Sequence, residues 1–367
     1  MHRTETPPVT RRTTGPRSDV LDQRVERGLD LVRAQLTDQV ATRRARARDL
    51  APAHASLWRS LGDQIGGRLM RPRLTLAAYL GLGGQEPSTV APVAAAQELL
   101  HTAMLVHDDL LDHDETRRGR PNVTGTARHR LTRAGITGRA ADDQVLAVGV
   151  LGGDVALASA FGMVAAAPVS PEVALRVLRT MTESVDTTVA GELLDVTGAL
   201  SGPAEVDALR VAELKTAVYS CCTPLVVGGL LAGADDVALG VLDRYGTAFG
   251  VAFQLLDDEL GVFGDPAVIG KSTLSDLREG KRTELLRLTC LRADAAGRAV
   301  LDRYLGRADL DEAGAAQLRA VIRDSGALDQ ARQVRAAAID RARTAVQEGL
   351  PAELAGYLTG LTRMLVA

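Results

Sequence analysis

Apolar segments with helical spacing make up most of the chain, and short polar breaks with glycine or proline separate them. Stretches rich in Ala, Leu, Val and Arg recur, whereas few runs show the strict alternation of β-branched residues that indicates a strand. The pattern therefore predicts an all-α fold. One helix is expected from Pro87 to Asp112, where Ser88 or Thr89 can cap its start.

A second helical segment is expected from Asp243 to Phe263, with Phe249 and Phe253 on an apolar face that belongs to the core. From residue 293 onward, further amphipathic helices close the bundle. Their expected breaks lie near Asp309, Ser325 and Pro351.

The N-terminal segment lacks this periodicity and is rich in Thr, Pro and Arg. We interpret residues 1–18 as a disordered tail, with a targeting or docking peptide as the alternative, and residues 19–367 as one domain. We interpret the apolar runs as shorter than the roughly 18 residues of a membrane span, so we expect no transmembrane segment. Ala- and Gly-rich faces at 145–166 and 218–233 fit either core packing or a homodimer interface.

Composition narrows the functional classes. A net charge of −3 gives no general attraction to nucleic acid. The arginine-rich run at 43–48 has no interleaved aromatic residues, so we interpret it as a solvated helix face. The cysteines (Cys221, Cys222 and Cys290) have neither metal-ligand spacing nor a disulfide framework, which predicts a reducing, cytoplasmic location.

Two acid clusters carry the candidate chemistry. Asp108, Asp109 and Asp112 end the first expected helix, and Asp257 and Asp258 lie in the second. Asp108 and Asp112 are four residues apart, so they share a helix face one turn from each other. Carboxylates beside apolar faces are costly to bury without cations. Mg²⁺, which takes one or two carboxylates together with waters and substrate phosphates, suits this pattern.

Basic residues accompany both clusters. Arg117 and Arg118 follow the first in a segment that Gly119 and Pro121 mark as a turn, so their side chains can fold back over it. Only three of the 43 basic residues are lysines: Lys215, Lys271 and Lys281. Because an ammonium group differs from a guanidinium as a phosphate ligand, these lysines are candidate phosphate contacts.

The motifs together resemble the all-trans isoprenyl (polyprenyl) diphosphate synthases over residues 66–283. The matching segments, in order, are GGRLMRP at 66–72, LLHTAMLVHDDLLD at 99–112, RRGRP at 117–121, GGD at 152–154, GELLD at 191–195, KTAVYS at 215–220, FQLLDD at 253–258 and GKSTLSDLREGKRT at 270–283. The resemblance implies an all-α, single-domain helical bundle of the isoprenoid synthase type with a central cavity, and a homodimer.

It also implies a Mg²⁺-dependent prenyltransferase that adds isopentenyl diphosphate to an allylic diphosphate (dimethylallyl, geranyl or farnesyl), with three ions expected per active site. The family positions that bind Mg²⁺ directly correspond to Asp108, Asp112 and Asp257, supported by Asp109 and Asp258. Those that hold the allylic diphosphate correspond to Arg117, Lys215, Lys271 and Lys281. Those that hold isopentenyl diphosphate correspond to Arg68, Arg71, His101 and Arg118. Those whose oxygens face the developing carbocation correspond to Thr216, Tyr219 and Gln254.

The sequence departs from the family pattern at four positions. Gly261 stands where a third aspartate of the second cluster is usual, and Asp265 lies further on. Arg68 and Leu69 stand where lysine and a second cation are common, and Glu192 replaces a usual glutamine near Asp195. These changes bear on the strength of metal and isopentenyl diphosphate binding.

Product length is expected to depend on the residues that precede the first cluster. Ala103 and Met104, five and four positions before Asp108, are not aromatic, so we expect growth beyond farnesyl, with geranylgeranyl diphosphate first and longer products next. The competing interpretations are a class I terpene cyclase, a non-catalytic partner subunit and, more remotely, a calcium-binding structural protein. The isopentenyl diphosphate pocket and the second acid cluster argue against the cyclase. The presence of both acid clusters argues against the non-catalytic subunit, and the lack of a loop with EF-hand spacing argues against the calcium-binding protein.

Overall fold

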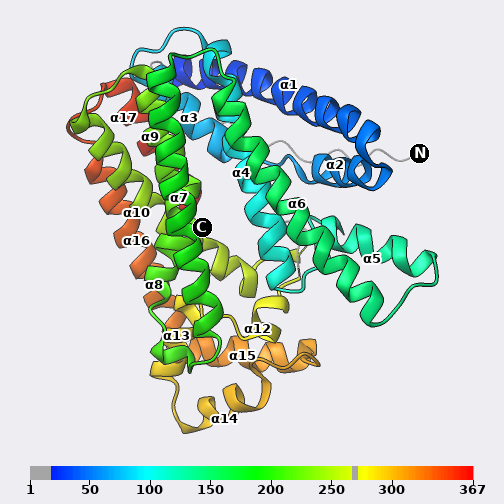
Figure 1. The fold of residues 1–367 in the computed structure, drawn as a ribbon. Helices are drawn as coiled ribbons and strands as arrows, with labels where there is room; N and C mark the ends of the chain where they lie inside the picture. Colours follow the sequence, from blue (N-terminus) through cyan, green and yellow to red (C-terminus); the bar gives the residue numbers. More distant parts are fainter. Residues whose placement is uncertain (1–17, 267–271, 367) are drawn as a thin grey trace, which may run out of the picture.

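The computed structural model describes residues 18–266 and 272–366. Within these ranges the regular structure is almost entirely helical, which confirms the all-α prediction (Figure 1). Two short strands, β1 (Thr116–Arg117) and β2 (Arg120–Pro121), pair as an antiparallel hairpin. The expected tail lies outside the described residues, apart from Ser18.

The helices form a large bundle and a smaller group beneath it, each with its own hydrophobic core. The large bundle contains α1 (Ser18–Leu50), α2 (Pro52–Gln64), α3 (Met70–Gly81), α4 (Pro87–Leu111), α5 (Val123–Arg133), α6 (Arg139–Ala165), α7 (Pro171–Gly198), η1 (Pro203–Glu205), α8 (Ala208–Val211), η2 (Ala212–Cys222), α9 (Thr223–Ala232), α10 (Asp236–Phe263), α16 (Ala327–Ala345), α17 (Ala352–Leu361) and η3 (Thr362–Leu365). The smaller group contains α12 (Ser275–Glu279), α13 (Glu284–Arg292), α14 (Ala295–Tyr304) and α15 (Glu312–Asp324), drawn at the bottom of Figure 1.

The predicted helix boundaries can be compared with these elements. The helix expected at 87–112 is α4, but its start is not capped by Ser88 or Thr89: Pro87 occupies the first turn and no side chain caps it. The helix expected from Asp243 begins earlier, at Asp236, where the Asp235 side chain accepts a hydrogen bond from the backbone N–H of Ala238. The breaks expected in the C-terminal third separate α14, α15, α16 and α17.

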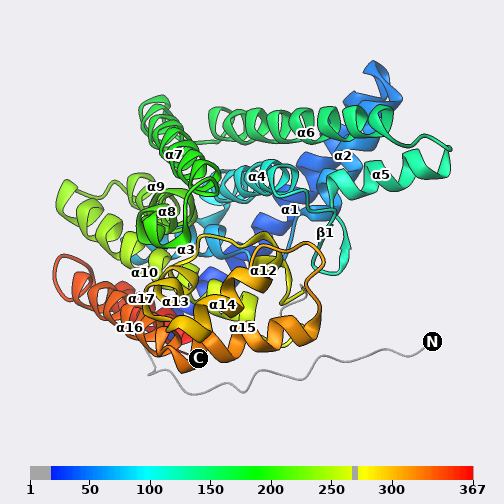
Figure 2. The same ribbon diagram turned by 90° about the horizontal axis from the view of Figure 1, so that it is seen from below.

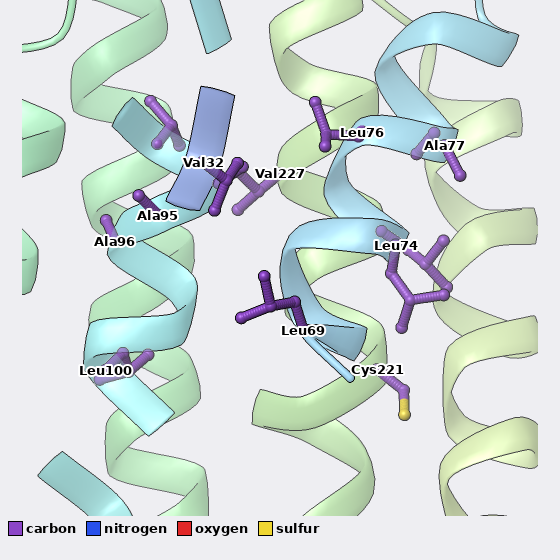
Figure 3. Close-up of a cluster of buried hydrophobic side chains, with 14 of the residues drawn as sticks. Val32, Leu69, Leu74, Leu76, Ala77, Ala95, Ala96, Leu100, Cys221 and Val227 are labelled. Carbon is purple, nitrogen blue, oxygen red and sulfur yellow. The ribbon is translucent and has the colours of Figure 1, made fainter. Parts of the chain in front are cut away.

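The core of the large bundle surrounds α4. Seen from below, α4 lies between α6 on one side and α3 and α1 on the other (Figure 2). Fully buried aliphatic side chains from α1, α3, α4 and α9 meet here, with Cys221 of η2 at the edge (Figure 3). A fully buried Leu or Val contributes about 1.5–3 kcal/mol, so this packing fixes the helix that carries the first acid cluster. Phe249 also belongs to this core, and Phe253 packs against it, as expected.

Glycines allow α7 and α10 to approach η2 closely. A Cβ atom at Gly191 would lie 2.3 Å from the backbone nitrogen of Lys215, and one at Gly250 would lie 2.5 Å from Cα of Ala217. η2 is a π-helix, a form that occurs mostly as short bulges and frequently at functional sites. The close contacts hold the irregular helix between its two neighbours, with Lys215 beside α7.

Within residues 18–266 and 272–366, three helical runs correct the expectation about apolar length. Pro87–Leu111, Arg139–Ala165 and Ala208–Ala232 are each long and apolar enough to cross a membrane, judged by length and composition. The most apolar windows of the first and third are 78% and 67% buried inside the fold, whereas that of α6 is 39% buried. The fold therefore buries most of the apolar window of α4 and of the run from Ala208 to Ala232. It buries the smallest share for α6.

Candidate active site

The first acid cluster lies at the C-terminal end of α4, where the helix dipole disfavours negative charge. Asp108 and Asp109 belong to the last turn, and Asp112 follows the helix directly. Arg117 of β1 folds back over them. Its Nε donates to Oδ1 of Asp109 at 2.9 Å, and its Nη2 donates to Oδ2 of Asp108 at 3.3 Å.

The surrounding cations set the charge of these carboxylates. Burial acts to raise the pKa of Asp108, but Lys215, Lys281 and Arg117 together hold that pKa below its ordinary value. Burial raises the pKa of Asp109 despite the hydrogen bond from Arg117. Asp108 is therefore kept ionised at neutral pH, as a carboxylate that holds a hard cation must be.

Lys215 of η2 joins the first cluster to two acids of α7. Its Nζ lies 3.2 Å from Oδ1 of Asp108, 3.0 Å from Oε2 of Glu192 and 2.6 Å from Oδ2 of Asp195. Burial acts to lower the pKa of Lys215, but the three carboxylates raise it above its ordinary value. Burial likewise raises the pKa of Glu192, against the pull of Lys215. Glu192, noted as a departure in the sequence, thus contacts the lysine at the centre of the site.

Lys281 binds the other end of the cluster. Its Nζ lies 2.9 Å from Oδ2 of Asp112 and 3.4 Å from Oε2 of Glu279. Gly280, with a φ of 61°, ends α12 in the left-handed region. The chain can then reverse so that the backbone N–H of Lys281 donates to the carbonyl of Asp276 at 3.0 Å. The turn after α12 therefore aims Lys281 at the end of α4.

The second acid cluster lies on α10 and connects to η2 through neutral groups. Oγ1 of Thr216 donates to Oε1 of Gln254 at 2.8 Å, and Nε2 of Gln254 donates to Oδ1 of Asp258 at 2.7 Å. Asp258 is buried and Asp257 is half-buried. Because Thr216 follows Lys215 directly, adjacent residues of η2 connect the clusters of α4 and α10.

The rotation of α10 is fixed from its far side. Buried Glu259 accepts hydrogen bonds from Arg332 and Arg335 of α16, with Oε2 of Glu259 2.6 Å from Nη1 of Arg335. At about 100° per residue, position 259 points roughly opposite to positions 257 and 261. The anchor on α16 therefore turns Asp257 and Gly261 away from α16.

The hairpin that carries Arg117 also places Arg118. Arg118 and Gly119 form its two-residue loop with φ values of 54° and 70°, and a type I′ turn requires such positive values at both positions. A non-glycine residue in this conformation is strained, a feature that concentrates at functional sites. Nη1 of Arg118 donates to the carbonyl of Gln64 at 3.2 Å, and its guanidinium lies against Gly67.

A second polar group lies behind the cluster, around Arg71 of α3. Its Nη2 donates to Oγ of Ser220 at 2.6 Å and to the hydroxyl of Tyr219 at 3.4 Å. That hydroxyl lies 3.3 Å from Nδ1 of His101, two turns before Asp108 on α4. Burial, with Arg71, Arg117 and Arg118 nearby, lowers the pKa of His101 well below its ordinary value. The imidazole is therefore neutral at neutral pH.

Two of the candidate residues are not joined to the site by a described contact. The sequence analysis also missed Glu98, a neighbour of the site. Lys271 lies outside the described residues. Arg68 is exposed, directly before buried Leu69. Glu98 is 2% exposed, and burial raises its pKa against the opposing charges of Arg71 and Arg118. Its position three residues before His101, on the same helix face, was the signal that could have revealed it.

The carboxylates suit Mg²⁺ only together with a phosphate ligand. Among the described residues, no three His, Cys, Asp or Glu side chains are grouped so that they could hold a metal ion by themselves. Mg²⁺ usually keeps several waters and takes one or two carboxylates plus substrate phosphates. Oxygen donors in two separate clusters, with lysines and arginines between them, fit that mode of binding.

Hollows on the surface do not locate this site. One of about 380 Å³ lies between α7, α9 and α10, lined in part by Cys222, Leu239 and Asp243. None of the acid-cluster residues lines it. We therefore assign the site from the convergence of charged side chains and not from this hollow.

Comparison with known proteins decides the family. A family model described as polyprenyl synthetase matches residues 59–322. The chain belongs to this family. The match covers α3 to α10, which carry both acid clusters, and continues into α15.

This polyprenyl synthetase family member is similar to proteins that differ in product. It is 34% identical to a geranylfarnesyl diphosphate synthase of Aeropyrum pernix over 76% of this chain and 83% of the relative. It is 36% identical to a geranylgeranyl diphosphate synthase of Mycobacterium tuberculosis over 64% of this chain and 62% of the relative. A crystal structure of geranylgeranyl pyrophosphate synthase from Corynebacterium glutamicum, complexed with isoprenyl diphosphate and magnesium, matches with a TM-score of 0.86 at 28% identity, covering 93% and 98% of the two chains.

These matches confirm the predicted fold type, the bundle of the isoprenoid synthases. They also make the chain a trans-prenyltransferase, because the relatives are prenyl diphosphate synthases. Product length differs between the relatives and is not fixed by the likeness.

Proposed function

We propose that this prenyltransferase condenses isopentenyl diphosphate with an allylic diphosphate and releases geranylgeranyl diphosphate. The supporting observation is the presence of two separate cationic groups along α4. Lys215, Lys281 and Arg117 contact the acid cluster at the end of the helix, and Arg71 lies with His101 two turns earlier. Two such groups suit two diphosphates, whereas a terpene cyclase needs one.

The acid clusters and their cations would hold the allylic diphosphate. Asp108, Asp112 and Asp257 would hold Mg²⁺, three ions in all, with Asp109 and Asp258 in support. When bound, Mg²⁺ supplies the positive charge that neutralises the departing diphosphate. Lys215, Lys281 and Arg117 would bind the phosphate oxygens, with Lys271 as a further ligand. Because the side chains of Lys215, Lys281 and Arg117 already lie at the acid cluster, binding of the diphosphate needs little further ordering of these three residues.

The carbocation and isopentenyl diphosphate would be held by different groups of residues. The oxygens of Thr216, Gln254 and Tyr219 would orient their dipoles toward the positive charge that develops as the allylic C–O bond breaks. Arg71 and Arg118, joined by Arg68, would hold isopentenyl diphosphate so that its double bond forms the new C–C bond. Neutral His101 would complete this pocket by hydrogen bonding. The proton lost from the adduct would pass to the released diphosphate.

Product length is proposed from the residues that precede the first cluster. Ala103 is 1% exposed and packs in the core around α4. A turn of helix rises about 5.4 Å, close to one isoprene unit, so a small residue at this depth leaves room for growth beyond farnesyl. Geranylgeranyl diphosphate is our first choice, and longer products are the alternative.

A product assay tests both parts of the proposal. The full-length protein is incubated with Mg²⁺, isopentenyl diphosphate and each allylic primer, with EDTA as the metal-free control. Consumption of isopentenyl diphosphate and a C20 product are expected. Cyclic hydrocarbons formed without isopentenyl diphosphate would favour the cyclase, and an inactive protein would favour the non-catalytic subunit. An exclusively C15 product would contradict the chain-length proposal alone.

We further propose that two copies pair through α6 and α7 in the cytoplasm. Leu146 and Leu151 of α6 are 53% and 59% exposed, and Leu193 of α7 is 58% exposed. These apolar side chains would be covered by a second copy. The free thiols of the three cysteines suit a reducing compartment. Light scattering in detergent-free solution should give the mass of a dimer. The Leu151→Glu variant should give the mass of a monomer under the same conditions.

A further inference from the structure

His107 lies directly before Asp108 on α4, and its imidazole is directed at α6, the helix that runs beside α4 (Figure 2). A Cβ atom built on Gly153 of α6 would lie 2.0 Å from Nε2 of His107 and 2.5 Å from its Cε1. Real atoms do not approach so closely, so the ring occupies the space that a side chain at 153 would need. A glycine inside a helix costs about 0.5–1 kcal/mol relative to alanine, and here it accommodates the imidazole.

Polar groups of α6 hold the ring in this place. Nε2 of His107 lies 3.4 Å from the backbone carbonyl oxygen of Val150, and because a carbonyl can only accept, Nε2 is the donor of this hydrogen bond. Oδ1 of Asp154 lies 3.6 Å from the same nitrogen. The His107 side chain is 33% exposed, so burial of apolar surface is not its main contribution. Its contacts are those of an anchor between two helices.

A second side chain of α4 fits α6 in the same way. A Cβ atom at Gly149 would lie 2.9 Å from Cδ2 of Leu110. At about 100° per residue, His107 and Leu110 share one face of α4, and Asp108 and Asp112 lie roughly opposite. The contacts with α6 therefore fix the rotation of the last turn of α4 from the side that faces away from the carboxylates.

The end of α4 needs such an anchor because two effects work against a regular last turn. Asp108 and Asp112 are four residues apart and repel each other by a few tenths of a kcal/mol, and the helix dipole disfavours negative charge at this end. A binding site must nevertheless hold its ligand groups within about 0.5 Å of the productive geometry. The ring of His107, fixed on α6, supplies a constraint one residue away from Asp108.

We propose that His107 is a positioning residue for the metal site. Held on α6 between Gly153 and the carbonyl of Val150, it fixes the direction in which Asp108 presents its carboxylate. The inference rests on the proposed function, in which Asp108 holds Mg²⁺. In this role His107 acts through its neighbour in the chain and contacts neither the metal nor the diphosphate.

Calorimetry of metal binding tests this role without measuring turnover. Mg²⁺ is titrated into the full-length protein saturated with inorganic pyrophosphate, and the heat of binding to free pyrophosphate is subtracted. We expect His107→Ala to lower the Mg²⁺ affinity about 10-fold, at the lower end of the loss found when a group that supports a metal ligand is removed. A loss of about twofold or less would overturn the inference. A wild-type protein that binds no Mg²⁺ with pyrophosphate would instead overturn the proposed function.

The place of the ring on α6 can also be filled without changing α4. In Gly153→Ala the added methyl group displaces the imidazole, and we expect the same loss of affinity as in His107→Ala. In the double variant His107→Ala/Gly153→Ala there is no ring to displace, so its affinity should equal that of His107→Ala alone. Such non-additivity is the mark of two residues in one contact. If Gly153→Ala costs as much in the His107→Ala background as in the wild type, position 153 does not act through the imidazole, and the inference is wrong.

A conservative variant separates positioning from a general effect on the fold. His107→Gln keeps an N–H donor at the same number of bonds from Cα as Nε2, so it should retain most of the Mg²⁺ affinity. A loss as large as that of His107→Ala would overturn the inference. His129→Ala makes the same change as His107→Ala at an exposed position of α5 and should bind Mg²⁺ like the wild type. A loss confined to His129→Ala would also contradict the role of His107.

Steady-state kinetics provide a further separation. His107→Ala should lower kcat at limiting Mg²⁺ and leave the KM for isopentenyl diphosphate unchanged, because the proposed pocket for that substrate lies around Arg71 and His101, two turns earlier on α4. A raised KM for isopentenyl diphosphate with an unchanged kcat would show that His107 serves the other pocket, and it would overturn the inference.

Discussion

The acid clusters of α4 and α10 are held in opposite ways. The α4 cluster lies at a helix end and contacts cations from three separate segments, through Arg117, Lys215 and Lys281. On α10, the described contact of Asp258 comes from the neutral amide of Gln254, and the rotation of the helix is set by Glu259 on its far side. Among the described contacts, those of the first cluster are ion pairs, whereas the second cluster is positioned by a hydrogen bond and by the orientation of its helix.

Removing one carboxylate from each helix should produce the largest effects. We expect Asp108→Ala and Asp257→Ala each to lower kcat about 10²- to 10³-fold, the range for loss of one group that stabilises transition-state charge. Steady-state assays with isopentenyl diphosphate and an allylic primer measure this. Asp49→Ala, at an exposed position of α1, is the control and should keep wild-type activity. Unimpaired turnover of the Asp108→Ala/Asp257→Ala double variant would contradict the site itself.

The ion pairs of the first cluster predict a cost in stability when their shared lysine is removed. Lys215→Met leaves Asp108, Glu192 and Asp195 without their shared cation, and we expect a loss of about 2 kcal/mol in the free energy of unfolding, below the 3–5 kcal/mol of a fully buried pair. Urea unfolding without Mg²⁺ measures it. Lys215→Arg is the matched control, since it keeps the charge and should keep most of the stability. A loss equally large in Lys215→Arg would show that shape, and not charge, holds the first cluster.

The sequence predicted the all-α fold, the helix bearing the first cluster and the residues around it, because these features depend on local periodicity and spacing. It did not reveal Glu98 or Asp276. Both are acidic residues whose environment comes from helices distant in sequence: Arg71 of α3 faces Glu98, and Gly261 of α10 faces Asp276. In the sequence, Gly261 looks like a position that has lost a carboxylate. Only the packing of α12 on α10 shows that the carboxyl group of Asp276 lies beside this glycine. The apolar length of α6 was also misjudged, since isolated small residues interrupt the run without ending the helix.

The residues that precede the two acid clusters also differ in size. Ala103 on α4 is small, whereas Phe253, one turn before Asp257 on α10, is aromatic and packs against the core. Ala103→Phe should therefore shorten the main product from C20 to C15, and chromatography of the dephosphorylated products measures it. Phe253→Ala should lower stability by about 2 kcal/mol without shortening the product. An unchanged product in Ala103→Phe would place the limit on chain length elsewhere.

The titration of Glu279 tests whether the two clusters share one electrostatic environment. The change in melting temperature that it causes should be the smallest of the predicted effects. Burial raises the pKa of Glu279 to about 7, with Lys281 opposing this change and Asp112, Asp114 and Asp276 reinforcing it. Between its ordinary pKa of 4.5 and about 7, the folded protein binds more protons than the unfolded chain. The resulting stabilisation is complete below that range and is lost as the pH rises through it.

The melting temperature of the metal-free protein should therefore fall more between pH 5 and 7.5 in the wild type than in Glu279→Gln, with a difference on the order of 1–2 °C. Glu348→Gln, at an exposed position, should behave like the wild type. Because Asp112 belongs to the first cluster and Asp276 lies against the second, Asp112→Asn and Asp276→Asn should each move the Glu279 transition to lower pH. If only Asp112→Asn moves it, the charge at Asp276 is not coupled to the first cluster, and the two acid clusters are electrostatically separate.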